Sequence, residues 1–216
     1  VNRFYIGNFR VVWGEGLMVD NTDEYRARIF NRSTGIFGDL TENRAYDFTG
    51  AGGSFYMPVS HLGMSVKPSF FYSTALRDAI INPDGTAWRI TQSPYLQLYP
   101  WRKDELEENT YGINFRLSPF EKANPGTYLA IEGMQLEYSG HTLCPAAKWI
   151  DIPMDRYDPE FYPEITALAR TNKRQYYGFE FLLPVKSMFV SGEFVRQKDS
   201  LGKANAYLLR TRLQYE

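Results

Sequence analysis

The chain lacks most of the features that identify a common class of protein. Its 216 residues include one cysteine, Cys144, so an internal disulfide framework is excluded. No apolar run approaches the roughly 18 residues of a membrane-spanning helix. The formal net charge is −1 and runs of like charge are missing, which gives no basis for a polyanionic partner. We therefore expect neither a spanning helix nor nucleic acid among the partners.

Motifs for cofactors and metals are equally scarce. Residues 14–16, Gly-Glu-Gly, lack the third glycine and the following helix of a dinucleotide-binding loop, and predict a bend. His141 and Cys144 have the spacing of two metal ligands. A zinc site normally needs three or four protein ligands, however, and His61 is the only other histidine. We expect no cofactor and no metal.

Catalytic motifs are missing too. The chain has no Gly-x-Ser-x-Gly elbow, which a hydrolase of that type would need. Asp39, Glu42 and Asp47 share one loop, but general acid-base catalysis needs a pair of groups held in a shielded site. A solvated loop is the simpler interpretation. We expect that the protein is not an enzyme.

Aromatic residues, in contrast, are abundant. The chain has 16 Tyr, 15 Phe and 4 Trp, and such residues are enriched in strands. The mean hydropathy is negative. A membrane barrel tolerates that value, because only every second strand residue faces lipid and the others can be polar.

The clearest pattern lies in residues 176–215, which predict three adjacent strands, each with an apolar and a polar face. The apolar rows are Tyr177, Phe179, Phe181, Leu183 and Val185, then Met188, Val190 and Phe194, then Tyr207, Leu209, Thr211, Leu213 and Tyr215. The polar rows include Glu180, Ser191, Glu193, Gln197, Arg210, Arg212 and Gln214. Tyrosines at the ends of apolar rows are typical of strands that cross a bilayer.

Further strands are predicted upstream. Their ranges are 1–13, 25–31, 51–59, 62–73, from 88, about 95–99, 111–117 and 128–138. This gives about ten strands, several of them near the roughly 9 to 11 residues of a tilted bilayer crossing. Pro58 and Pro68 predict bulges or edge positions, because proline cannot donate a ladder hydrogen bond. Loops are predicted over 32–48, 103–108 and about 140–175, with a turn at 82–85 and a short helix at 163–170.

Three segments of the N-terminal quarter carry a resemblance to a known family. They are Ile6-Gly7-Asn8-Phe9-Arg10-Val11-Val12-Trp13-Gly14-Glu15-Gly16-Leu17, then Arg32-Ser33-Thr34-Gly35-Ile36, then Leu40-Thr41-Glu42-Asn43-Arg44 with Phe48-Thr49-Gly50-Ala51. Together they resemble outer-membrane β-barrel proteins of the Bacteroidetes type, some of which carry helix-hairpin-helix segments ahead of the barrel. The resemblance implies a membrane barrel and implies no reaction.

The pattern and the resemblance together give our main expectation. We expect a single domain over 1–216, an antiparallel transmembrane β-barrel of the Gram-negative outer membrane or a large fragment of one. It would act as a porin-like pore or as a structural scaffold, with membrane lipid and other outer-membrane subunits as partners. Since the chain begins at Val1 without a leader, we also expect a removed signal peptide or an internal fragment.

The candidate site is the lumen of that barrel. Its expected lining residues are Lys67, Arg116, Glu180, Glu193, Arg210 and Arg212. Mixed charge at such positions either holds a solvated channel or forms a closed network of ion pairs. The sequence leaves both arrangements open.

Two alternatives belong to other classes. One is a soluble β-sandwich that binds carbohydrate through exposed Trp and Tyr, in which the apolar strand faces would form one internal core. The other is a lipid-modifying outer-membrane enzyme with His61 or His141 as its base, each close to a serine, Ser60 or Ser139. The direction in which the apolar faces point separates the barrel from the sandwich.

Overall fold

The computed structural model describes residues 2–19, 34–38, 48–81, 85–90, 104–143 and 170–213. Within these ranges lie twelve strands and one 3-10 turn, η1 (Ser60–Leu62). The strands are β1 (Arg3–Val12), β2 (Gly35–Gly38), β3 (Phe48–Ser54), β4 (Met57–Val59), β5 (Met64–Arg77), β6 (Ala79–Ile81), β7 (Ala87–Ile90), β8 (Leu106–Ser118), β9 (Tyr128–Ser139), β10 (Lys173–Val185), β11 (Met188–Asp199) and β12 (Gly202–Leu213). None of the described segments is a helix of the length and apolarity that would let it cross a membrane.

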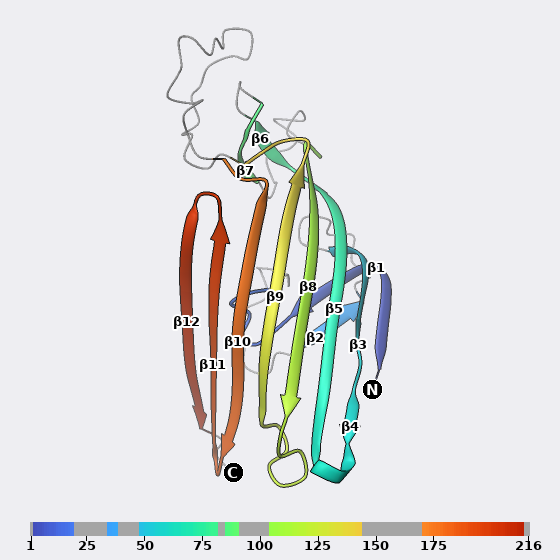
Figure 1. The fold of residues 1–216 in the computed structure, drawn as a ribbon, viewed down its shortest axis with the longest axis vertical. Helices are drawn as coiled ribbons and strands as arrows, with labels where there is room; N and C mark the ends of the chain where they lie inside the picture. The colour runs from blue at the N-terminus through green and yellow to red at the C-terminus, as the bar shows by residue number, and fades with distance from the viewer. Residues whose placement is uncertain are drawn as a thin grey trace.

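Ten of the strands form one antiparallel sheet (Figure 1). The order is β12-β11-β10-β9-β8-β5-β3-β1-β2, with β4 beside β5, while β6 and β7 pair with each other. The expectation of an all-β antiparallel fold of about ten strands is confirmed. Among the described residues β12 and β2 do not pair with each other, so the sheet has two free edges.

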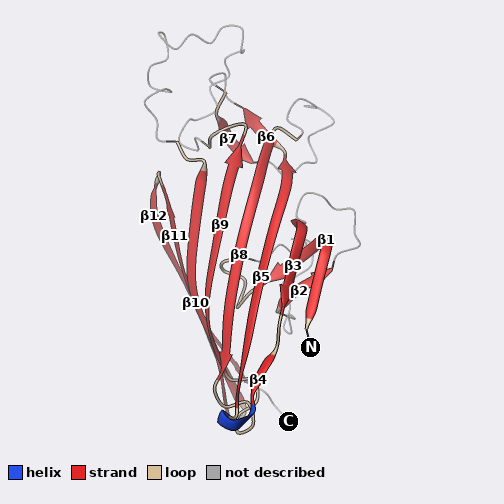
Figure 2. Ribbon diagram, turned by 45° about the vertical axis from the view of Figure 1, so that its right-hand side comes forward, coloured by secondary structure: helices blue, strands red, loops and turns tan. Residues whose placement is uncertain are grey.

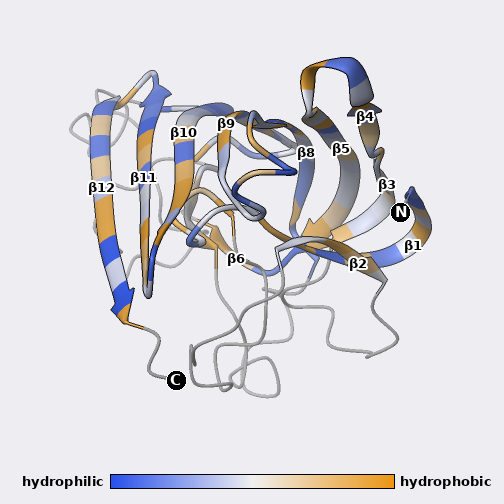
Figure 3. Ribbon diagram, turned by 90° about the horizontal axis from the view of Figure 1, so that it is seen from below, coloured by the Kyte–Doolittle hydropathy of each residue, from blue (hydrophilic) through white to orange (hydrophobic). Residues whose placement is uncertain are grey.

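The sheet is strongly curved, as the view from below shows (Figure 3). Short connections join β8 to β9 and β10 to β11 at one end, where Lys186 takes a positive φ of 55° in the turn. The longer excursions between β5 and β8 and between β9 and β10 leave at the other end (Figure 2). Short turns on one rim and long loops on the other are typical of barrels.

The predicted alternation of the strands is confirmed, and it separates two chemically different faces. Large apolar side chains are exposed on the convex face. They include Phe70, Tyr72, Leu76, Tyr111, Ile113, Phe115, Leu129, Ile131, Tyr177, Phe179, Leu183, Val185, Tyr207, Leu209 and Leu213. The concave face carries buried polar residues, among them Ser65, Ser69, Ser73, Glu108, Thr110, Asn114, Glu132, Glu180, Ser191 and Glu193. Polar residues are therefore inside and apolar residues outside.

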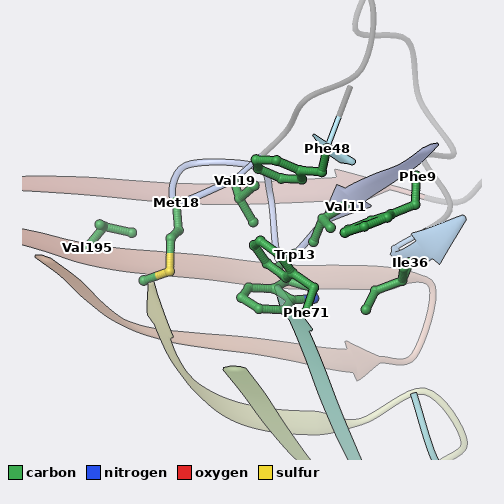
Figure 4. Close-up of a cluster of buried hydrophobic side chains, with 9 residues drawn as sticks. All are labelled: Phe9, Val11, Trp13, Met18, Val19, Ile36, Phe48, Phe71 and Val195. Carbon is green, nitrogen blue, oxygen red and sulfur yellow. The ribbon is translucent and has the colours of Figure 1, made fainter. Parts of the chain in front are cut away.

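The first strand departs from this rule. Its larger apolar row, Phe9 and Val11 followed by Trp13, faces the concave side and is buried. These side chains pack with Met18, Val19, Ile36, Phe48, Phe71 and Val195 in one cluster (Figure 4). The barrel interpretation predicts that the apolar face of every strand points outward. This prediction is wrong for β1, because its apolar side chains pack against Met18 and Val19 of the segment that follows the strand.

Both prolines lie where a ladder bond is not required. Pro58 is in β4, which pairs with β5 alone. Pro68 in β5 lies opposite the interruption between β3 and β4, and its carbonyl accepts from the Phe55 N–H at 2.9 Å. The prediction of edge or irregular positions for these two prolines is confirmed.

Other local predictions had mixed outcomes. Residues 35–38, expected in a loop, form β2, and residues 106–108, also expected in a loop, begin β8. The strand expected over 51–59 is interrupted between β3 and β4. The strands expected at 25–31 and 95–99 and the helix expected at 163–170 lie outside the described residues.

Candidate functional site: a polar network inside the curved sheet

Three carboxylates from adjacent strands lie close together on the concave face. Glu132 is on β9, Glu180 on β10 and Glu193 on β11, and Glu180 pairs directly with Glu193 across the ladder. Their exposed fractions are 6%, 1% and 3%. Because buried carboxylates are costly unless they are hydrogen-bonded or paired, this row requires compensating partners.

Strand β8 supplies part of the compensation. The Asn114 side-chain amide donates to Glu180 Oε1 at 3.1 Å and to Glu132 Oε2 at 3.4 Å. The Arg116 guanidinium lies 3.4 Å from the same oxygen of Glu180 and stacks over the Tyr128 ring at 3.9 Å. One amide and one guanidinium thus link the two carboxylates to β8.

The remaining compensation comes from residues 14–19, which we call the crossing segment. It leaves the end of β1 and traverses the interior to β11 (Figure 4). The backbone N–H groups of Glu15, Leu17 and Met18 all donate to the Glu193 carboxylate, at 2.7, 3.1 and 2.8 Å. A carboxylate held by several backbone N–H groups is a strong, charge-assisted arrangement.

Gly14 makes this close approach possible. Its φ is 53°, and a Cβ there would lie 2.8 Å from Glu193 Oε2 and closer still to Glu180 Oε2. A side chain at this position would therefore meet both carboxylates. The predicted bend at residues 14–16 is confirmed, and its role is to bring backbone donors to the acidic row.

Glu15 connects the crossing segment to the edge strand β12. Its carboxylate pairs with the guanidinium of Arg210 and lies 3.7 Å from that of Arg212. The Ser191 hydroxyl on β11 donates to Glu15 Oε1 at 2.5 Å. The segment that follows β1 is thus bound by charge to the opposite side of the sheet.

The structure brings together five of the six expected lumen residues. Arg116, Glu180, Glu193, Arg210 and Arg212 all take part in the network. Lys67 also lies on the concave side but apart from the carboxylates, in a separate cavity with Arg3. We call the network formed by Glu15, Asn114, Arg116, Glu132, Glu180, Ser191, Glu193, Arg210 and Arg212 the interior network.

The expected lining left out four members of this network, Glu15, Asn114, Glu132 and Ser191, although Ser191 was assigned to the polar row of its strand. Glu132 and Asn114 do lie on the polar face of their strands, a signal that could have identified them. Glu15 carried no comparable signal, because its partners are more than 170 positions away in the chain. Only the fold places it beside them.

The other candidate groups have simpler surroundings. His141 Nδ1 lies 2.6 Å from the Gly85 carbonyl oxygen, and its Nε2 lies 3.9 Å from Glu105. His61 is in η1, at the opposite end of the sheet (Figure 1). Cys144 and the acidic loop of Asp39, Glu42 and Asp47 lie outside the described residues.

The arrangement has a chemical consequence. Four largely buried carboxylates face three guanidinium groups and several neutral donors, so opposite charges offset one another. The Arg210 and Arg212 side chains are 41% and 33% exposed, so this side of the network meets solvent. Such a network holds the crossing segment in place.

Comparison with protein-family models, curated proteins and solved structures finds no match to this chain.

Proposed function

We propose that the chain forms the wall of an outer-membrane β-barrel that serves as a closed scaffold. The observation that carries this proposal is the inverted polarity of the sheet, apolar on the convex face and charged on the concave face. A protein in water rarely exposes such a large apolar surface, because the exposure is unfavourable and promotes association. In a bilayer the same face meets hydrocarbon.

The dimensions of the apolar rows support this proposal. In β10 the convex row runs from Tyr177 to Val185, a separation of eight residues. At about 3.3 Å per residue this is roughly 26 Å along the strand. A tilt of about 40° gives a height of roughly 20 Å, which is close to the roughly 25 Å apolar band of membrane barrels.

The upper limit of the band has the expected chemistry. Tyr72 and Tyr111 lie side by side with ring centroids 5.1 Å apart, and the Tyr72 hydroxyl donates to Asn109 at 3.0 Å. Beyond them the convex face becomes polar, with a hydrogen bond between Gln175 and Gln135 at 3.0 Å. Tyrosines between an apolar band and a polar rim match the aromatic belts of membrane proteins.

The interior supports a scaffold over an open pore. The crossing segment and the interior network occupy the concave side, with the buried ion pair of Glu180 and Arg116 among them. A conducting pore needs continuous water along its axis. Here the Glu193 carboxylate binds the backbone of the crossing segment, and Glu15 binds Arg210 and Arg212 instead.

The proposal also has a requirement. Lipid contains no water to satisfy free backbone groups, so an open sheet edge is not stable in the hydrocarbon region. The free edges at β12 and β2 must therefore pair with each other or with strands outside the described residues, including strands of another outer-membrane subunit.

The carbohydrate-binding sandwich requires the opposite arrangement. Its apolar rows would converge on a common core, whereas the apolar side chains of the convex rows here are exposed. They lie on the outside of the sheet, whose curvature Figure 3 shows. The geometry therefore favours the barrel over the sandwich.

A labelling experiment tests the orientation of the faces. Two neighbouring positions at one depth, Leu208 on the concave face and Leu209 on the convex face, are each replaced by Cys in a Cys144→Ser background. Each variant is labelled with a fluorophore and folded into vesicles containing lipids with quenchers on their acyl chains. We expect strong quenching at Leu209→Cys and weak quenching at Leu208→Cys.

Equal quenching at the two positions would contradict the proposal. A second measurement does not depend on the label: barrels folded in detergent migrate differently on gels before and after heating. A monodisperse protein that stays in solution without detergent would also reject the membrane assignment.

A further inference from the structure

A cavity of about 440 Å³ lies on the concave side, beside the Arg116 end of the interior network. Strand β2 forms one wall, and the concave faces of β1, β3 and β5 form the other. β2 also contacts β3, where a Cβ on Gly52 would lie 3.1 Å from Phe71 and 3.4 Å from Ile36. The cavity is thus a product of the fold, partly open and formed between segments far apart in the chain.

Two basic side chains line this cavity. Arg3 projects from β1 and Lys67 from β5, and the two strands are separated by β3. Arg116, which pairs with Lys67 across the ladder, adds a third positive charge nearby.

The positive charges are not balanced locally. Arg116 pairs with Glu180, but in the described part of the chain no carboxylate forms an ion pair with Arg3 or Lys67. Lys67 is half-buried. Arg3 is exposed beside it, so the two side chains present positive charge at the cavity, and an anion bound between them would be attracted by both.

Neutral groups complete the lining. Ser54 is 3% exposed and pairs with Arg3 across the ladder. Thr34 accepts from both terminal nitrogens of Arg116 at 3.4 Å, which leaves its own hydroxyl proton available. Tyr56 also lines the cavity, but its hydroxyl donates to Glu121 at 2.5 Å.

We propose that this cavity binds a small molecule bearing a phosphate or carboxylate group, with the anionic group between Arg3 and Lys67. Guanidinium and ammonium groups are the side chains that recognise such oxyanions. The volume exceeds that of a bare phosphate and accommodates an attached group of sugar size. The site does not depend on whether the convex face meets lipid.

Calorimetric titration tests the proposal. The full chain is folded in neutral maltoside micelles and titrated with glucose 6-phosphate, with inorganic phosphate and with glucose. We expect binding of both phosphates, weakening as salt rises, and none of glucose. Absence of binding by either phosphate, or equal binding of glucose, would overturn the proposal.

Variants assign the binding to the cavity. Arg3→Gln and Lys67→Gln should each weaken phosphate binding by about tenfold or more, because each removes a charge-assisted contact. Lys67→Arg should retain it. The matched control is Lys203→Gln, an exposed lysine at the start of β12, which should bind like the parent. An unchanged affinity in both cavity variants would place the anion elsewhere and refute the site.

A further comparison identifies the source of the phosphate. The titration with glucose 6-phosphate is repeated in micelles that contain phosphatidylglycerol. Loss of the titration would mean that a lipid headgroup occupies the cavity, and an unchanged titration would mean that it takes a soluble anion. Circular dichroism spectra of the variants confirm that each is folded.

Discussion

At the scale of single residues, Gly14 is the position with the least room for change. Ala at this site would place a methyl group against the carboxylates of Glu180 and Glu193, at a φ of 53°. We expect Gly14→Ala to lower the free energy of unfolding by about 3 kcal/mol or more, from backbone strain of about 1–2 kcal/mol plus displacement of a buried hydrogen-bonded carboxylate. Denaturant titration of the folded protein in detergent measures the loss.

The matched control for this substitution is Gly63, which has a φ of 63° and no atom within 4 Å of an added Cβ. Gly63→Ala therefore carries only the backbone strain, about 1–2 kcal/mol. If both variants lost the same stability, the close packing of Gly14 on the carboxylates would be disproved.

A pH-dependent contact lies at the rim with short turns. The Tyr56 hydroxyl donates to Glu121, and this hydrogen bond is the main cause that lowers the pKa of the Glu121 carboxyl and raises the pKa of the Tyr56 phenol. A depressed carboxyl pKa contributes stability that is present above the ordinary pKa of glutamate and is lost as the pH falls through the folded value. We expect Tyr56→Phe to raise the pKa of Glu121 toward that ordinary value.

Carbon-13 NMR of the Glu121 side-chain carboxyl, followed from neutral to acidic pH, measures this change. An unaltered Glu121 titration in Tyr56→Phe would mean that the phenol does not act on the carboxylate.

The charged residues show what sequence alone could and could not predict at this scale. Arg116, Glu180 and Arg210 could be assigned to the concave face because alternation fixes the side of a strand on which each residue lies. Alternation does not say which of these groups touch. Their contacts depend on the ladder register and on Glu15, which reaches them from another part of the chain.

At the scale of elements, the crossing segment is the part that would close the interior under the proposed function. Three backbone donors bind Glu193, and Glu15 binds β11 and β12. We expect the double variant Glu15→Gln, Glu193→Gln to release the segment, because it removes both charged attachments and leaves Arg210 and Arg212 without their carboxylate. Under the proposed function, this variant should show conductance steps in planar lipid bilayers, whereas the parent should show none.

Glu137→Gln provides the control for the loss of charge. Glu137 pairs with Lys173 at 3.4 Å on the convex side, where both side chains are more than two-fifths exposed. Its neutralisation should leave the conductance at the level of the parent protein. Steps of equal size in the parent would show that the interior is open and that the crossing segment is no plug.

The elements also differ in how far their sequences predict them. The strands β10, β11 and β12 follow from local alternation and agree with the structure. β2 has only four residues, two of them glycine, and no pattern of its own. It becomes a strand because the free edge of β1 pairs with its residues Gly35 to Gly38. This tertiary pairing overrides a weak local preference for strand.

At the scale of the whole molecule, the inverted polarity is the property with the largest consequence, and the alternation in the sequence predicted two different faces without assigning one of them to the interior. A period of two is compatible with a sandwich and with a barrel, so the sequence could not decide which face is internal. The buried Glu180 and the exposed Ile131, on adjacent strands, place the charged face inside. In a soluble protein the same two residues would be expected to exchange places.

The energetic effect of this polarity can be measured with a single charge placed at two depths. Ile131 on β9 is 63% exposed and pairs with Phe115 and Phe179 in the middle of the apolar band. Leu76 on β5 is 57% exposed and pairs with Glu107 near the polar rim. If the convex face meets lipid, Ile131→Lys should lower the unfolding free energy in phospholipid vesicles by about 2–4 kcal/mol, and Leu76→Lys by about 0–1 kcal/mol. If the face meets water, both substitutions should change it by less than about 0.5 kcal/mol, as exposed surface substitutions generally do. Guanidinium titration of the two variants in vesicles separates these outcomes. Equal small losses of unfolding free energy at both depths would exclude a membrane-embedded wall, because water does not distinguish the middle of the band from its rim.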